Sequence, residues 1–126
     1  MVDALLDTAI IIDLLREYEP AAEWIASQDQ AFGVTKFARM EIIEGCINNQ
    51  GLRRALRILK PFEIIPIAVQ DIDWVHDKLA EFRLSHNVDP FDCLIAATPF
   101  RLQIPLYTRD LKHFTPLIGE LAIQPY

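Results

Sequence analysis

Short apolar stretches alternate with amphipathic stretches along the chain, and this alternation constrains the fold more than any other feature. The stretches that read as strands are 2–6, 31–35, 62–67, 106–108 and 121–124. Helices are predicted over residues 36–49, 52–59 and 69–84. Three further helices are predicted to begin near Thr8, Pro20 and Pro90. Strands separated by helices predict an α/β fold of three layers, a mostly parallel central sheet with helices on both faces.

The size of the chain predicts one domain over residues 1–126. The chain has 126 residues and a mass of 14.5 kDa, and 52% of its residues are hydrophobic, enough for a proper core. No uncharged stretch exceeds eight residues, whereas a membrane helix needs about 20 apolar residues. No membrane-spanning segment is therefore expected.

The start of the chain and its cysteines point to a cytoplasmic protein. The first residues, MVDALLDT, have neither a basic region nor a long apolar run, so no secretory signal is expected. Cys46 and Cys93 follow no metal-binding or disulfide spacing, which suits a reducing compartment. Neither G-x-G-x-x-G nor a P-loop is present, so a nucleotide cradle has no support.

The net charge limits how this chain can bind nucleic acid. At a formal charge of −6 it does not attract a phosphate backbone through overall charge, although a local patch still can. One stretch of four cations without an acid comprises Arg53, Arg54, Arg57 and Lys60. It is either a solvated helix face or a contact for RNA or a partner protein.

Four acidic residues share a position relative to the predicted strands. Asp7 ends the first strand, Asp110 follows the strand 106–108, and Glu41 and Asp92 lie in the first two turns of their helices. In folds of this class the working site lies beyond the carboxyl ends of the strands. We therefore expect these four side chains to converge at one edge of the sheet.

The remaining acids are expected to have structural positions. Solvated helix faces or first turns suit Glu17, Glu19, Asp71, Asp73, Asp77 and Glu81. Asp13 is expected to face solvent or pair with Arg16, and Asp89 is expected to cap the helix that begins at Pro90.

Cations flank the predicted acidic site in sequence. Arg101, Arg109 and Lys112 can offset the negative charge and hold a phosphate there. His113 lies three residues after Asp110 and would reach a phosphate if its loop folds over the site, whereas the three histidines together match no zinc motif.

Converging carboxylates predict a metal ion. Two like charges 4 Å apart repel by about 4 kcal/mol at an effective dielectric of 20, and a divalent cation relieves this. Hard oxygen ligands favour Mg²⁺ or Mn²⁺. Because metal-held water can attack phosphorus, the reaction class that follows is hydrolysis of a phosphodiester.

Four blocks of sequence carry a resemblance to a known family. LLDTAIIIDLLR, ARMEIIEG, FDCLIAAT and YTRDLKHF, in this order and spacing, resemble the signature blocks of PIN domains, most closely the VapC-like toxins of bacterial toxin–antitoxin pairs. The resemblance implies a magnesium-dependent ribonuclease, with Mn²⁺ as a substitute, that homodimerises. It also implies an antitoxin that covers a hydrophobic groove drawn from helices 8–28 and 52–59.

The same resemblance assigns roles to individual residues. Asp7 and Asp92 match the principal metal ligands, Glu41 a glutamate that binds metal or activates water, and Asp110 the fourth acidic position. Thr108 matches a neighbouring polar residue that supports the ligands, and Arg109 beside it is a candidate for the same support or for a phosphate contact. Ala9 and Pro99 depart from the family pattern without removing a carboxylate.

Two alternatives stay open at this point. A receiver-like phosphoacceptor module suits the size and acidity, but no Asp lies between Asp29 and Asp71, where the acceptor of such a module should end a strand. A PIN-like domain that only binds a partner protein is the other, although all four acids are present.

Overall fold

A single parallel sheet forms the centre of the computed structural model, which describes residues 1–126. Its strands are β1 (Ala4–Leu6), β2 (Phe32–Thr35), β3 (Glu63–Ile65), β4 (Leu106–Tyr107) and β5 (Ala122–Ile123). Their order is β3-β2-β1-β4-β5, and every neighbouring pair is parallel. The α/β class and the parallel sheet predicted from the alternating pattern are therefore confirmed.

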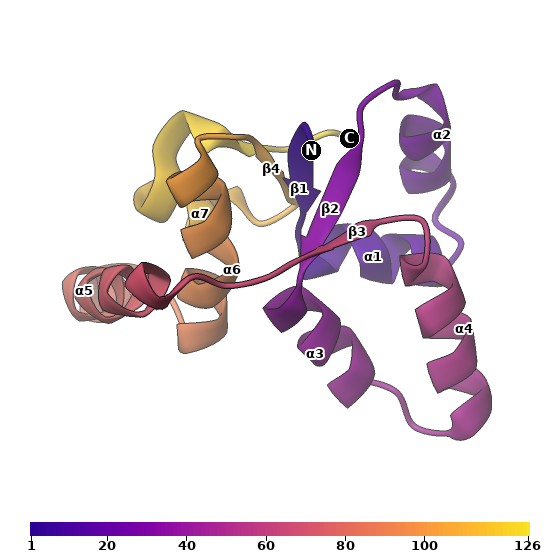
Figure 1. Cartoon of the computed structure of the whole chain (residues 1–126), viewed down its shortest axis with the longest axis horizontal. Coiled ribbons are helices and arrows are strands. Elements are labelled where there is room, and N and C mark those ends of the chain that lie inside the picture. The colour runs from indigo at the N-terminus through magenta and orange to yellow at the C-terminus, as the bar shows by residue number, and fades with distance from the viewer.

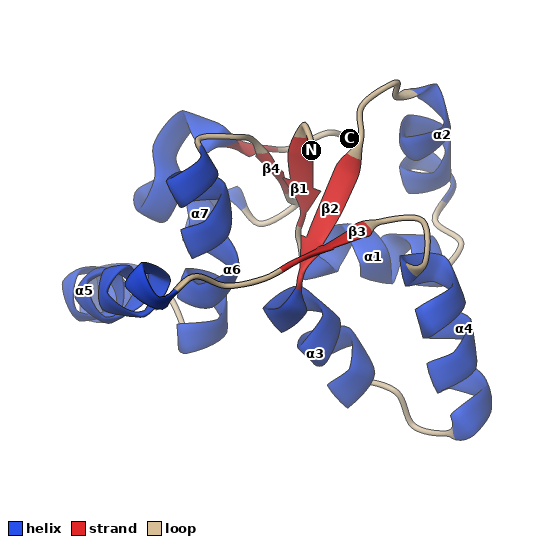
Figure 2. Ribbon diagram, viewed as in Figure 1, coloured by secondary structure: helices blue, strands red, loops and turns tan.

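Helices lie on either side of this sheet (Figures 1 and 2). They are α1 (Thr8–Leu15), α2 (Glu19–Ser27), α3 (Lys36–Glu44), α4 (Asn49–Leu59), α5 (Val69–His86), α6 (Pro90–Leu102) and α7 (Leu111–Ile118), with a 3-10 turn, η1 (Gly119–Leu121). Helix α1 contacts α2, α3 and α4, whereas α5, α6 and α7 contact one another. In Figure 1 these two groups stand on opposite sides of the strands.

The strands lie in the middle of the core. All three residues of β1 and all four of β2 are buried, as expected for a sheet covered on both faces. Gly33 in β2 is required by this packing, because an added Cβ would lie 2.8 Å from Ile65 and 3.0 Å from Leu5 on the two neighbouring strands. The centre of the sheet therefore has no room for a larger residue.

The helix predicted over residues 36–49 is in fact divided. Helix α3 ends at Glu44, and α4 begins at Asn49, because the Asn48 side chain accepts a hydrogen bond from the Gly51 amide and so caps a new helix. The sequence pattern also missed α7, which contains Pro116. None of the helices is both long and apolar enough to cross a membrane.

The direction of the strands decides where the site lies. Strands β1 and β2 run the same way, and helices α1 and α3 begin directly at their carboxyl ends, at the lower edge of the sheet in Figure 1. Helix α7 likewise follows β4 after a short loop. Three helix N-termini therefore gather at one edge, and they bring Asp7, Thr35 and Asp110 there as their capping residues.

Candidate active site

Asp7 is the buried centre of the candidate site. It caps α1, and only 5% of it is exposed. Its Oδ1 accepts a hydrogen bond of 2.7 Å from the Thr8 amide, and its Oδ2 accepts one of 2.8 Å from the Thr108 hydroxyl. Both carboxylate oxygens are thus held in fixed directions by residues of β1–α1 and of the loop after β4.

Two threonines connect Asp7 to two of the other predicted acids. The Thr8 hydroxyl donates to Glu41 Oε1 at 2.8 Å, which links α1 to α3. The fully buried Thr108 hydroxyl accepts from the Asp110 amide at 2.9 Å while it donates to Asp7. Asp7, Glu41 and Asp110 therefore belong to one network of hydrogen bonds, as expected for three residues at the carboxyl edge.

Asp110 caps α7 and holds a histidine beside it. Its Oδ1 accepts from the His113 amide at 3.3 Å, and its Oδ2 lies 2.7 Å from His113 Nδ1. Each side chain remains partly exposed, at 40% for Asp110 and 26% for His113. The histidine thus extends the hydrogen-bond network towards solvent.

Asp92 reaches the same region from α6. It forms a capping box with Asp89: the Asp92 amide donates to Asp89 Oδ1 at 2.8 Å, and the Asp89 amide donates to Asp92 Oδ2 at 3.2 Å. The prediction that Asp89 caps this helix is confirmed. Asp92 has no hydrogen bond to the other three acids, but its charge is one of the causes that raise the pKa of Asp7.

Burial and mutual repulsion disfavour ionisation in this group. Burial, followed by repulsion from Glu41 and Asp92, raises the pKa of Asp7 to about 7, although the bonds from Thr108 and Thr8 oppose the shift. Burial also raises the pKa of Asp92, to which repulsion from Asp89 and Asp110 adds. Each of these two acids is therefore disfavoured in its charged form by burial first and by its acidic neighbours second.

No basic side chain other than His113 forms a hydrogen bond or an ion pair with these acids. None of the ion pairs made by lysine or arginine involves Asp7, Glu41, Asp92 or Asp110. By the chemistry of their donor atoms the four carboxylates fit a hard divalent cation. As the side chains stand, no three acidic, histidine or cysteine residues are arranged closely enough to surround an ion. The structure therefore gives a suitable donor set in an open arrangement.

Two other acids are buried: Asp13 is so contrary to the sequence-based prediction, and Asp71 lies in the first turn of α5, one of the two positions expected for it. Asp13 does not face solvent or pair with Arg16: it is 5% exposed and pairs with Arg109, whose Nη1 lies 3.1 Å from Oδ2. Asp71 is 2% exposed and accepts from Arg101 Nε at 2.9 Å. The arginines expected to offset the acidic site thus have their own carboxylate partners, remote in sequence. No local pattern signals such pairs.

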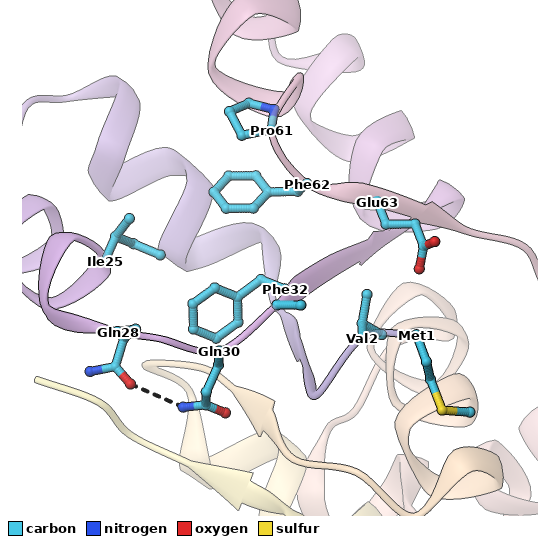
Figure 3. A pocket seen from close by; sticks show the side chains of 10 residues that line it. Met1, Val2, Ile25, Gln28, Gln30, Phe32, Pro61, Phe62 and Glu63 are labelled. Atoms are coloured by element: carbon cyan, nitrogen blue, oxygen red, sulfur yellow. Dashed lines mark hydrogen bonds between the residues drawn. The ribbon is translucent and has the colours of Figure 1, made fainter.

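One cavity lies away from the acids, at the opposite edge of the sheet. It has a volume of about 400 Å³ and is lined mainly by residues that precede or begin β1, β2 and β3 (Figure 3). Gln28 and Gln30 line its polar side, and Phe32 and Phe62 its apolar side. A second cavity, of about 380 Å³, borders the site: Glu41 and Arg54 line it together with apolar residues of α1, α3 and α4.

Comparisons with known proteins agree with this fold. The model of the PIN domain family matches residues 4–115. Ribonuclease VapC19 of Mycobacterium tuberculosis is 30% identical over 128 residues, which cover 97% of this chain and 98% of that protein. A toxin–antitoxin complex from Klebsiella pneumoniae contains a chain with 26% identity and a TM-score of 0.75, with 98% of both chains covered. DNA-bound VapBC from Salmonella typhimurium aligns over 98% of both chains with a TM-score of 0.78, and at 21% identity it supports the fold alone.

Proposed function

The chain belongs to the PIN-domain family, and on that premise we propose that it is an Mg²⁺-dependent endoribonuclease, the toxin of a toxin–antitoxin pair. One observation carries the proposal: buried Asp7 shares a hydrogen-bond network with Glu41 and Asp110 and has no lysine or arginine partner. The similarity to a ribonuclease along nearly the whole chain supports the same activity. The proposed enzyme is a single domain, residues 1–126, of the cytoplasm.

Asp7, Asp92, Glu41 and Asp110 are the side chains that would hold Mg²⁺ or Mn²⁺. Such an ion supplies a water nucleophile at neutral pH and neutralises the charge that develops on the phosphate. Thr108 and Thr8 orient Asp7 and Glu41, since each hydroxyl donates to a carboxylate oxygen. Hydrolysis adds water to phosphorus and breaks one P–O bond of the RNA backbone.

The acidic site also controls when RNA can bind. Phosphates and unpaired carboxylates repel each other, and the whole chain is negatively charged. A bound divalent cation would offset part of that negative charge at the place where the scissile phosphate must lie. We therefore expect RNA binding to need the metal and to weaken steeply with salt.

An antitoxin segment is the proposed partner for the second cavity. Ile12 and Leu15 of α1 and Ala55 of α4 give it an apolar lining, and Glu41 places it beside the candidate site. These helices are the ones from which the family resemblance draws a groove. A segment bound there would cover the approach to Glu41 and block activity without changing the fold.

A homodimer is part of the proposal as well. Met40 and Ile43 of α3 and Ile64 of the edge strand β3 are large apolar side chains left exposed, and they line one shallow cavity. Burial of this surface between two copies would remove it from water. Sedimentation equilibrium of the purified chain measures the mass directly.

Cleavage of RNA by purified protein tests the activity. We expect cleavage with Mg²⁺ or Mn²⁺ and none with a chelator. Asp7→Asn and Asp92→Asn should each lower kcat about a thousandfold, which corresponds to about 4 kcal/mol of barrier. Asp73→Asn, an exposed acid of α5 without a hydrogen bond, is the matched control and should keep full activity.

Two outcomes would contradict the proposal in different ways. Full activity in both Asp7→Asn and Asp92→Asn would show that the catalytic site is elsewhere. A wild-type chain that binds Mn²⁺ but cleaves no RNA would favour the alternative, a PIN domain that serves only to bind a partner protein.

A further inference from the structure

Arg109 lies between two residues of the candidate site in the sequence, yet its side chain is engaged with the far part of α1. Its Nη1 donates to Asp13 Oδ2 at 3.1 Å, and the Tyr126 hydroxyl donates to the same oxygen at 2.7 Å. The guanidinium carbon lies 5.1 Å from the centre of the Tyr18 ring and 5.3 Å from that of Tyr126. We call these four side chains the Asp13 clamp.

The clamp fixes the direction of the Arg109 side chain. Asp13 is almost fully buried, and a buried carboxylate is unstable unless charged or hydroxyl donors satisfy it. Arg109 and Tyr126 supply those donors, and the two tyrosine rings leave the planar guanidinium few orientations. Burial and the Asp13 bond also raise the pKa of Tyr126, so its hydroxyl stays a donor.

The segment 108–110 is consequently attached to α1 at two points. At the start of α1, the Thr108 hydroxyl donates to Asp7, and six residues further along the Arg109 guanidinium donates to Asp13. The backbone already holds the start of the segment, because the Thr108 amide donates to the Ile123 carbonyl at 2.9 Å, and the Arg109 attachment fixes the orientation of the residues that follow. Asp110, whose amide donates to Thr108, inherits that orientation, and so does His113 beside it.

We propose that the Asp13 clamp is a positioning device, which holds residues 108–110 so that Asp110 and His113 are correctly placed relative to Asp7. Arg109 then acts through its neighbours and does not contact the substrate phosphate. The catalytic part of this inference rests on the proposed nuclease function, but the positioning itself is a property of the protein without metal or RNA.

Conservative variants test the clamp against a matched ion pair. Arg109→Lys keeps the charge but loses the planar group between the rings, and Tyr126→Phe removes one hydroxyl. Arg101→Lys is the control, because Arg101 also pairs with a buried aspartate, Asp71, in a contact between α6 and α5. In RNA cleavage with Mn²⁺, Arg109→Lys should lower kcat between about tenfold and a hundredfold with KM within about twofold, as expected for misplaced groups. Arg101→Lys should lower thermal stability about as much as Arg109→Lys does, but it should leave kcat unchanged.

A second measurement needs neither metal nor activity. In NMR spectra of the metal-free protein, the ring signals of His113 should shift in Arg109→Lys and Tyr126→Phe and stay in place in Arg101→Lys. If wild type cleaves no RNA, the proposed function fails, and these signals alone still decide whether the clamp positions His113.

Three results would overturn the inference. A raised KM with unchanged kcat in Arg109→Lys would make Arg109 a substrate contact. Equal kcat values in Arg109→Lys and Arg101→Lys would reduce the clamp to a contribution to stability. Unchanged His113 signals in both clamp variants would show that the position of Asp110 and His113 is set elsewhere.

Discussion

The two ends of helix α1 each bury an aspartate, and they treat it in opposite ways. Asp7 and Asp13 are both 5% exposed. Asp13 receives an arginine and a tyrosine hydroxyl, whereas Asp7 receives only an amide and a threonine hydroxyl and has acidic neighbours. A buried carboxylate with a cation is a structural device. A buried carboxylate without a cation destabilises the fold, and this feature supports the proposal that Asp7 is functional.

The comparison predicts that the same chemical change has opposite effects at the two ends. In metal-free protein at pH 8, Asp7→Asn should raise the free energy of unfolding by up to about 4 kcal/mol, because it removes a charge that burial disfavours. The folded-state pKa of Asp7 is about 7 against an ordinary value of 3.8, so the wild type should lose stability as pH rises from about 4 to 7. The advantage of the variant should vanish near pH 4.

Urea denaturation in the presence of a chelator at pH 4, 6 and 8 measures this effect. Asp73→Asn serves as control, since it removes one exposed charge and should change stability little at any of these pH values. If Asp7→Asn were less stable than wild type at pH 8, the account of Asp7 as an uncompensated charge would be wrong.

At the other end of α1 we expect the same kind of substitution to lower stability. Asp13→Asn should lower the free energy of unfolding by about 2 kcal/mol, because a hydrogen bond to a charged partner is replaced by a weaker one and Arg109 loses its counter-ion. The same denaturation series gives the value. A variant as stable as wild type would mean that the Asp13 pair contributes nothing to folding, and the contrast between the two ends would disappear.

The smallest expected change concerns the threonine next to Asp7. Thr8→Val keeps the shape of the side chain and removes the hydroxyl that donates to Glu41, so stability should change by less than about 1 kcal/mol. Because Glu41 loses its orientation, RNA cleavage should fall about tenfold. Parallel denaturation and cleavage assays would separate the effect on stability from the effect on cleavage. Unchanged cleavage would show that Thr8 does not contribute to the site.

The sequence predicted the placement of the acids but not their partners. Strand–helix alternation and the rule for carboxyl ends sufficed to bring Asp7, Glu41 and Asp110 to one edge, since both depend on local pattern and topology. The roles assigned to them by resemblance stay predictions. The burial of Asp13 was not foreseen, because its partner Arg109 lies on another element and only the folded chain brings the two together.

The errors in the predicted helices, at the break between α3 and α4 and in α7, have local explanations. Gly45 and the capping residue Asn48 mark the break between α3 and α4, but the apolar spacing through Ile47 masked it. In α7 the proline at position 116 argued against a helix, and burial of Phe114 and Leu117 in the core outweighs that penalty. Tertiary packing thus determines the secondary structure where the local pattern is ambiguous.

Calorimetric titration with Mn²⁺ tests the central claim most directly, that the uncompensated acids around Asp7 bind a divalent cation. Wild type and Asp73→Asn should bind Mn²⁺ with equal affinity, and at pH 6 binding should release close to one proton, because Asp7 with its pKa of about 7 must ionise. Asp7→Asn should bind at least about tenfold more weakly and release fewer protons. Absence of binding to the wild type, or equal binding to Asp7→Asn, would contradict the account.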